Sequence, residues 1–105
     1  MMRLHYRRGG LSIPAAVRTA CLAGAEGVAL LRDGRDLLII PVLQAGAGGF
    51  LLKQRSPSGD CVVHAGPFFY EHGLDDHPLT LEACWDDSNA RLVVPGLFST
   101  ADVVA

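Results

Sequence analysis

The sequence predicts a mainly β fold with one short helix. Its apolar residues fall in short runs rich in Val, Ile and Leu, which are typical of strands. Twelve glycines and six prolines separate these runs, and both residue types end strands and form turns. Half of the residues are hydrophobic, so we expect a folded core rather than a disordered chain. A chain of 105 residues suffices for one small domain or two very small units.

The first 43 residues are expected to form four strands around the helix. Pro14 suits the first turn of a helix, because its missing N–H would have no partner there, and Gly24 ends the helix after two turns. Asp33-Gly34 predicts a hairpin, since a type I′ turn requires positive φ. We place the strands at residues 3–7, 11–13, 28–31 and 37–42.

The second half is expected to contain only strands, and the best linker candidate precedes it at residues 44–49. We therefore divide the chain into a unit at residues 1–43 and a β-rich segment at residues 50–105. Residues 31–41 also resemble residues 85–95, since both combine a strand, an acidic turn, a β-branched strand and a proline. Internal duplication and chance similarity between hairpins both explain this. The expected strands are 50–54, 61–64, 68–70, 79–85 and 91–94.

Charge is distributed unevenly along the chain. Residues 1–55 hold eight of the nine basic side chains and three acidic ones, a net charge of +5. Residues 56–105 hold one basic and eight acidic side chains, a net charge of −7. This asymmetry favours one surface for an anionic partner and another for something else, although two solvated faces would show the same pattern.

The cysteines and the apolar runs indicate a cytoplasmic protein. Three cysteines are an odd and sparse set, which predicts reduced thiols rather than a disulfide framework. No apolar run approaches the roughly 18 residues of a membrane span. The first eight residues lack the apolar core of a signal peptide.

We expect no metal, no cofactor and no catalytic activity. The ligand types that zinc takes occur within residues 61–84, but their spacing is irregular and no Cys-x-x-Cys pair is present. His64 with Asp60 or Glu71 would make an acid–base dyad and Cys84 a nucleophile, yet nothing in the sequence fixes these groups together. The cysteines and histidines of this stretch are Cys61, His64, His72, His77 and Cys84.

The run from Arg8 to Arg18, Arg-Gly-Gly-Leu-Ser-Ile-Pro-Ala-Ala-Val-Arg, resembles the start of the AbrB/MazE/SpoVT family and its MraZ relatives. The family pattern is a glycine, usually a basic residue, a two-residue strand, Ile-Pro, two variable residues, an aliphatic residue and an arginine. Residues 27–42 supply the apolar strand, glycine turn and proline-ended strand that follow, so the resemblance covers residues 3–43. The positions in register are Gly9, Leu11, Ser12, Ile13, Pro14, Val17 and Arg18.

Two positions depart from the family pattern. Gly10 stands where the family has its basic residue, which removes an expected DNA contact. Glu26-Gly27 replaces the usual Gly-Asp before the third strand, and the loop there is one residue longer. A turn-capping side chain is therefore lost.

The resemblance implies a swapped-hairpin β-barrel formed by a homodimer, in which each copy contributes two interleaved hairpins. Pairing with a second copy would also remove the exposed edges of strands too short to close a core alone. The implied function is sequence-specific binding of double-stranded DNA, as a transcriptional regulator or as the antitoxin of a toxin–antitoxin pair. The implied DNA contacts are Arg3, Arg7, Arg8 and Arg18.

Other roles stay open for these arginines and for the acidic half. The arginines could keep a strand edge solvated, and Arg18 could form a salt bridge to Glu26 or Asp33. The acidic segment at residues 50–105 could mask a basic site on a toxin, complete the core, or add a second dimer contact.

A second resemblance leads to an alternative function. Residues 59–66, Gly-Asp-Cys-Val-Val-His-Ala-Gly, look like the closing strand of HypC-type hydrogenase-maturation chaperones, which are small barrels. The alternative is thus a non-enzymatic β-barrel protein-interaction module, or a HypC-like chaperone, that binds no DNA. Those chaperones need a cysteine next to the initiator methionine, and Met2 occupies that position here.

Overall fold

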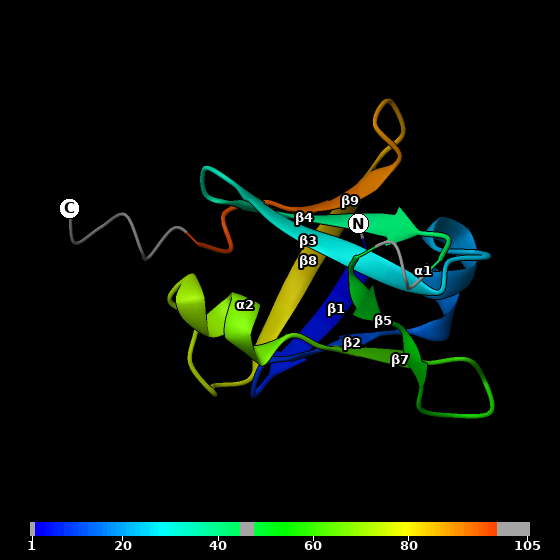
Figure 1. The fold of residues 1–105 in the computed structure, drawn as a ribbon, viewed down its shortest axis with the longest axis horizontal. Coiled ribbons are helices and arrows are strands. Elements are labelled where there is room, and N and C mark those ends of the chain that lie inside the picture. The colour runs from blue at the N-terminus through cyan, green and yellow to red at the C-terminus, as the bar shows by residue number, and fades with distance from the viewer. Residues whose placement is uncertain (1, 45–47, 99–105) are drawn as a thin grey trace.

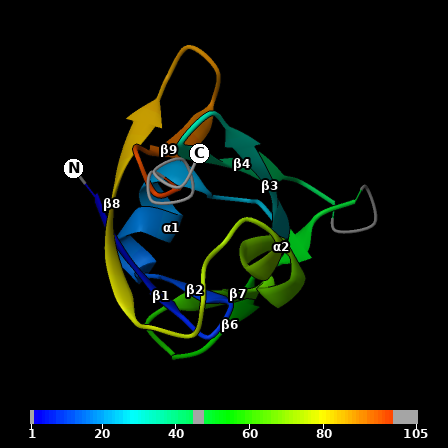
Figure 2. The same cartoon turned by 90° about the vertical axis from the view of Figure 1, so that its left-hand side faces the viewer.

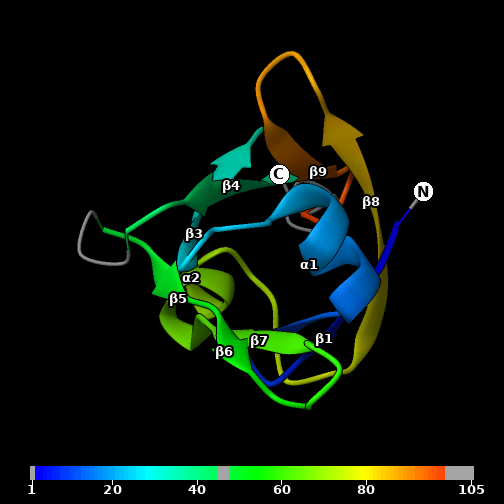
Figure 3. The ribbon, with the colours of Figure 1, turned by 90° about the vertical axis from the view of Figure 1, so that its right-hand side faces the viewer.

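The computed structural model of the chain, which describes residues 2–44 and 48–98, is in that part of the chain a nearly closed β-barrel with a short helix near each of its two ends (Figures 1, 2 and 3). The hydrogen-bonded strand order is β5-β3-β4-β9-β8-β1-β2-β7-β6. Figures 2 and 3 show the ring of strands from its two ends, with β4 and β9 on one side and β2 and β7 on the opposite side. Among the described residues, no helix is long and apolar enough to cross a membrane.

The first hairpin confirms the predicted strands and their break. In β1 (Met2–Arg7), Leu4 and Tyr6 are buried and the residues between them are exposed, because alternate side chains of a strand point to opposite faces. Arg8 and Gly9, both with positive φ, form the tight turn to β2 (Gly10–Ile13). The predicted helix follows as α1 (Ala15–Cys21).

The second hairpin also confirms its sequence signal. The strands β3 (Gly27–Asp33) and β4 (Asp36–Val42) pair along their whole length around a two-residue turn. The hairpin is confirmed, but the central residues of its turn are Gly34 and Arg35, and only Gly34, at 61°, has a positive φ, as in a type II′ turn rather than the expected type I′ turn. Leu30, Leu37 and Ile39 point from these strands into the core.

The run of residues 50–54 closes the barrel. Its first part, β5 (Phe50–Leu51), pairs with β3, and its second part, β6 (Lys53–Gln54), pairs with β7 (Cys61–His64). These two pairs are the two ends of the strand order, so a single chain segment covers both edges of the sheet.

One sequence expectation is wrong: residues 68–70 form a helix, not a strand, and the fold has two helices rather than one in its described part. The helix α2 (Gly66–Glu71) has Pro67 in its first turn, where proline is tolerated. Phe69 is fully buried and its ring packs edge-on against Tyr6, with centroids 5.0 Å apart, while Tyr70 is exposed. Residues 68–70 are all aromatic, so they show no alternation of polar and apolar residues that would distinguish a strand from a helix. The helix is the conformation that buries Phe69 in the core.

Strands from both halves of the chain alternate around the barrel. β1 pairs with β8 (Leu79–Asp86), β2 with β7, and β4 with β9 (Arg91–Val94). Buried residues from residue 4 to residue 98 belong to a single hydrophobic cluster. The segments that we divided at residues 44–49 therefore share one sheet and one core.

The pairing scheme has an internal two-fold relation. Exchanging β1 with β5–β6, β2 with β7, β3 with β8 and β4 with β9 maps every strand pair onto another strand pair or onto itself. The helices correspond as well: Val17 of α1 and Phe69 of α2 each supply the buried side chain of their helix. The relating axis passes between β2 and β7 on one side of the barrel and between β4 and β9 on the other.

The same relation explains the similarity of residues 31–41 to residues 85–95. The two similar stretches are 54 residues apart in the sequence. The two-fold relation matches inward-facing residues of β3 with residues 53 positions later in β8, and inward-facing residues of β4 with residues 55 positions later in β9. The difference arises because the β8–β9 loop between Asp86 and Arg91 has two more residues than the β3–β4 turn.

We expect Gly9→Ala to destabilise the barrel strongly. Gly9 has a φ of 75°, and a Cβ there would lie 2.5 Å from the backbone Cα of Gly66 at the start of α2. The left-handed conformation costs an alanine about 1–2 kcal/mol, and the backbone overlap adds about 1–3 kcal/mol. Urea unfolding measures the loss.

Gly24→Ala is the matched control. Its φ is 79°, and nothing lies within 4 Å of the added Cβ, so only the conformational cost of about 1–2 kcal/mol applies. Equal losses in the two variants would contradict the close packing of the first hairpin on α2.

Candidate nucleic-acid interface

Positively charged side chains gather on the outer face of β1, β2, β7 and β6. Paired residues of antiparallel strands share a face, so the register places His5 beside Ser12, Ser12 beside Val62, and Val62 beside Lys53. The neighbouring row runs from Arg7 through Gly10 to His64. Arg8 in the β1–β2 turn and Arg55 after β6 extend these rows. We call this surface the basic face: Arg7, Arg8, Lys53, Arg55, His5 and His64.

The centre of the basic face is a shallow depression of about 540 Å³. Arg7, Arg8 and Arg55 line it together with both histidines, and the start of β8 forms its far wall. No acidic side chain is among its described lining residues. The depression therefore presents positive charge, while the carboxylate of Asp76, which accepts a hydrogen bond from Tyr70, lies close to the β1–β2 turn.

The β1–β2 turn holds Arg7 and Arg8 in place. The carbonyl oxygen of Gly9 accepts a hydrogen bond of 2.9 Å from the N–H of Ala65, next to the start of α2. Tyr6 points inward from the same strand and donates a hydrogen bond of 2.7 Å to the carbonyl oxygen of Asp75. Hydrogen bonds to α2 and to the loop after it therefore hold the backbone that carries Arg7 and Arg8.

The loop between β6 and β7 fixes the position of Arg55. The Arg55 N–H donates to the carbonyl oxygen of Asp60 across the base of the loop. The carboxylate of Asp60 accepts a hydrogen bond of 2.8 Å from the Ala15 N–H at the start of α1, and another of 3.0 Å from the Ser56 hydroxyl. These hydrogen bonds, first of all that from Ala15, hold the pKa of Asp60 below its usual value.

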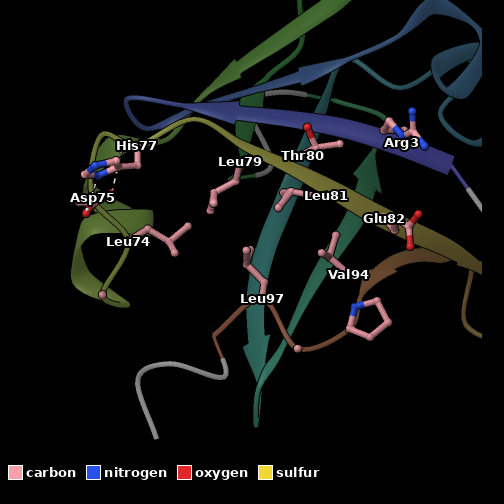
Figure 4. A pocket seen from close by; sticks show the side chains of 13 residues that line it. Arg3, Leu74, Asp75, His77, Leu79, Thr80, Leu81, Glu82, Val94 and Leu97 are labelled. Carbon is pink, nitrogen blue, oxygen red and sulfur yellow. Dashed lines mark hydrogen bonds and ion pairs between the residues drawn. The ribbon is translucent and has the colours of Figure 1, made fainter. Parts of the chain in front are cut away.

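The structure brings together two of the four arginines that the resemblance implied. Arg7 and Arg8 both line the central depression. Arg3 lies at the other end of β1, about 13 Å away along the strand, and lines a different depression, where Glu82 is its partner in register (Figure 4). His77 and Asp75, 3.0 Å apart, lie at the far end of that second depression.

Arg18 lies on α1, outside the described lining of the basic face. Its side chain is half-buried, and its Nε has no hydrogen-bond partner in the described part of the chain. No ion pair joins it to Glu26 or Asp33 within residues 2–44.

Sequence reasoning missed Lys53 and Arg55 as members of the site. Both belong to the basic stretch 1–55, and that charge excess was the only signal for them. Their position became visible only with the pairing of β6 against β7, because residues 53 and 54 face Val62 and Cys61 across a long loop.

The cysteines and histidines of residues 61–84 are not gathered in one place. His64 lies on the basic face and His77 in the loop before β8, while Cys61 points into the barrel. No group of three His, Cys, Asp or Glu side chains in the described ranges is arranged to hold a metal ion.

Comparison with family models, with curated proteins and with solved structures finds no match to this chain.

We expect Asp60→Asn to lower stability at neutral pH but not at low pH. The pKa of Asp60 is lower in the folded protein, so its charge stabilises the fold above the unfolded pKa of about 3.9. That contribution is lost as the pH falls through the folded pKa. The difference in Tm between the native protein and Asp60→Asn, measured by circular dichroism, should therefore be present at pH 7 and should shrink progressively as the pH falls below about 4, through the lowered pKa of Asp60.

Asp87→Asn provides the control, because Asp87 is an exposed carboxylate in the β8–β9 loop. Its Tm should follow that of the native protein at every pH. A Tm difference for Asp60→Asn that persists unchanged at pH 3 would show that the carboxylate charge does not hold this loop.

Proposed function

We propose that the chain binds double-stranded DNA through the basic face and acts as a sequence-specific regulator. The proposal rests on one observation: four positively charged side chains lie on one side of the barrel. Arg7 and Arg8 come from the first half of the chain, and Lys53 and Arg55 from the run that closes the barrel. A protein that neutralises several phosphates gains affinity from released counterions.

The dimensions of the basic face suit a duplex. Four adjacent strands about 4.8 Å apart span roughly 14 Å, and the β1–β2 hairpin is a two-stranded ribbon with a tight basic turn. Because β8 and β7 pair with the two strands of this hairpin, it cannot enter the major groove as a free ribbon, and in this proposal the basic face lies across the duplex. In this arrangement Arg7 and Arg8 read guanine edges or phosphates, and Lys53 and Arg55 contact the flanking backbone.

The internal two-fold relation supports a swapped-hairpin barrel completed within one chain. The family that residues 3–43 resemble builds its barrel from two interleaved copies of a hairpin pair. Here β5–β9 and α2 occupy the places that a second copy would fill. In this proposal the homodimer expected from the resemblance is not needed to close the barrel, and Lys53 takes the place related to Arg7.

The antitoxin role is a proposal about the acidic side of the same molecule. Glu71, Asp75 and Asp76 lie on α2 and in the loop after it, next to the β1–β2 turn that carries Arg8. A toxin with a basic RNA-binding site would be attracted there.

Binding to a mixed-sequence duplex of about 20 base pairs, followed by fluorescence anisotropy, tests the proposal. Four phosphate contacts predict that log Kobs falls against log salt concentration with a slope of about −3.6. Arg7→Ala should weaken binding about 10-fold and make that slope shallower by about one contact. Arg55→Ala should do the same, because it lines the same depression.

Arg3→Ala is the matched control on the same strand. Arg3 lies opposite Glu82 at the far end of β1, so its loss should change the affinity less than 2-fold. A chain that ignores duplex DNA at low salt would refute the proposal and favour the protein-interaction module. An effect of Arg3→Ala as large as that of Arg7→Ala would place the DNA on a different surface.

A further inference from the structure

The basic face is hollow at its centre because β2 carries small residues on its outer side. The outward positions of β2 are Gly10 and Ser12, and they alternate with residues that point into the core. The neighbouring strands β1 and β7 carry longer side chains beside these two positions, so a groove runs along β2 between two walls. We call it the β2 groove: Gly10 and Ser12 at the floor, with His5, Arg7, Val62 and His64 at the walls.

Three guanidinium groups surround the β2 groove. Arg7, Arg8 and Arg55 all line the central depression of about 540 Å³ that the groove forms. The hydroxyl-bearing residues Ser12 and Thr80 line it as well, and a hydroxyl can donate a hydrogen bond. Planar guanidinium groups bind phosphate oxygens through paired, charge-assisted hydrogen bonds. The groove therefore offers several donors to one compact anion.

The carboxylates beside the β2 groove have partners of their own. Asp76, close to the β1–β2 turn, accepts a hydrogen bond from the Tyr70 hydroxyl. Asp60 accepts a hydrogen bond of 2.8 Å from the backbone N–H at the start of α1. In the described part of the chain, no ion pair joins either carboxylate to the three arginines. Their charges stay available to a ligand.

A second depression, of about 360 Å³, continues the β2 groove toward the start of α1. Ser12 and Arg55 line both depressions, so the two adjoin. The second depression is lined by the apolar side chains of Ile13 and Pro14 and also by Asp60, whose charge repels an anion. The first depression thus suits an anionic group, and the second suits an uncharged group with a hydrogen-bond donor.

We infer that the β2 groove binds a small phosphate monoester, with its phosphate between Arg7, Arg8 and Arg55 and its uncharged part over Ile13 and Pro14. A monoester concentrates about 1.5 to 2 negative charges on one phosphate at pH 7, whereas each phosphate of a duplex carries one. Convergent cations in a hollow match the more concentrated charge. This inference goes beyond the proposed DNA binding and does not depend on it. Where both hold, the ester and the duplex compete for Arg7 and Arg8.

Titration of the full chain without DNA, followed by amide NMR spectra at about pH 7 and constant ionic strength, tests the inference. The probes are adenosine 5′-monophosphate, inorganic phosphate and adenosine. We expect the monophosphate to bind with a Kd below about 1 mM, inorganic phosphate to bind about 5-fold more weakly, and adenosine not to bind measurably. The amide signals of Gly10, Ser12 and His64 should shift during the titration.

Two of these outcomes would overturn the inference. One is that neither phosphate probe binds up to about 10 mM. The other is that inorganic phosphate and the monophosphate bind equally well, which would leave the second depression without a role and indicate a site for the free anion. Shifts that avoid the amides of β2 and β7 would overturn it as well.

Arg7→Gln and Arg55→Gln should each weaken the monophosphate about 10-fold, because each removes a charge-assisted pair of hydrogen bonds. Arg3→Gln is the matched control. Arg3 lies on the same strand as Arg7 but opposite Glu82 and lines a different depression, so its loss should change the affinity less than about 2-fold. An equal effect of Arg3→Gln would show that only the total charge matters, and would overturn the inference.

Ser12→Tyr separates shape from charge. It keeps every cation and fills the floor of the β2 groove with a residue that favours strands, so it should weaken the monophosphate at least about 10-fold. An unchanged affinity in this variant would place the ligand elsewhere and overturn the inference. Duplex binding is measured separately. A chain that binds the monophosphate but no duplex would retain this inference and refute the proposed function.

Discussion

Everything in this molecule depends on closing a barrel from strands that are too short to be stable alone. β2, β7 and β9 each have four residues, and β5 and β6 have two. All of these strands except β6 pair with a strand from the other half of the chain, and β6 continues β5 and closes the ring against β7. Unpaired strand edges would leave backbone donors and acceptors without partners, so each half needs the other. The run of residues 50–54 is the most important for closure, because its first part pairs with β3 and its second part pairs with β7. Lys53 lies on that run and Arg55 follows it directly, so the segment that closes the barrel also supplies two of the cations of the basic face.

The two-fold relation in the backbone does not extend to surface chemistry, and this difference separates the two sides of the barrel. The axis leaves the barrel between β2 and β7 on one side and between β4 and β9 on the other. On the first side the outward positions are Gly10, Ser12 and His64, flanked by arginines; on the second they are Leu38 and Val93. Inward positions related by the axis are all apolar, such as Leu11 with Val63 and Leu37 with Leu92, because the core requires it. Outward positions have no such requirement, so strands related by the axis can carry basic and polar residues on one side of the barrel and apolar residues on the other.

Local signals predicted local structure, and failed where a contact distant in sequence decided the outcome. Pro14 predicts the start of a helix and Asp33-Gly34 predicts a hairpin, because these residues have their own φ preferences. The helix and the hairpin are both present. The turn at Arg8-Gly9 follows from the same chemistry. Residues 68–70 became a helix because Phe69 fills the core beside Tyr6, sixty-three positions earlier in the chain, and no alternation reveals that. The site followed the same rule. Arg7 and Arg8 were named as candidates from the resemblance of residues 3–43, whereas Lys53 and Arg55 lie beside them only through the pairing of β6 with β7.

A net charge of −2 constrains how a basic face on this chain can bind DNA. The long-range field of the molecule does not attract a duplex, so attraction begins only when the basic face is already near the phosphates, within a Debye length of roughly 8–10 Å. In the proposed DNA binding, encounter would be orientation-dependent, because Glu71, Asp75 and Asp76 would repel a duplex that approaches from the α2 side. Short-range contacts from a few cations give limited affinity to one chain.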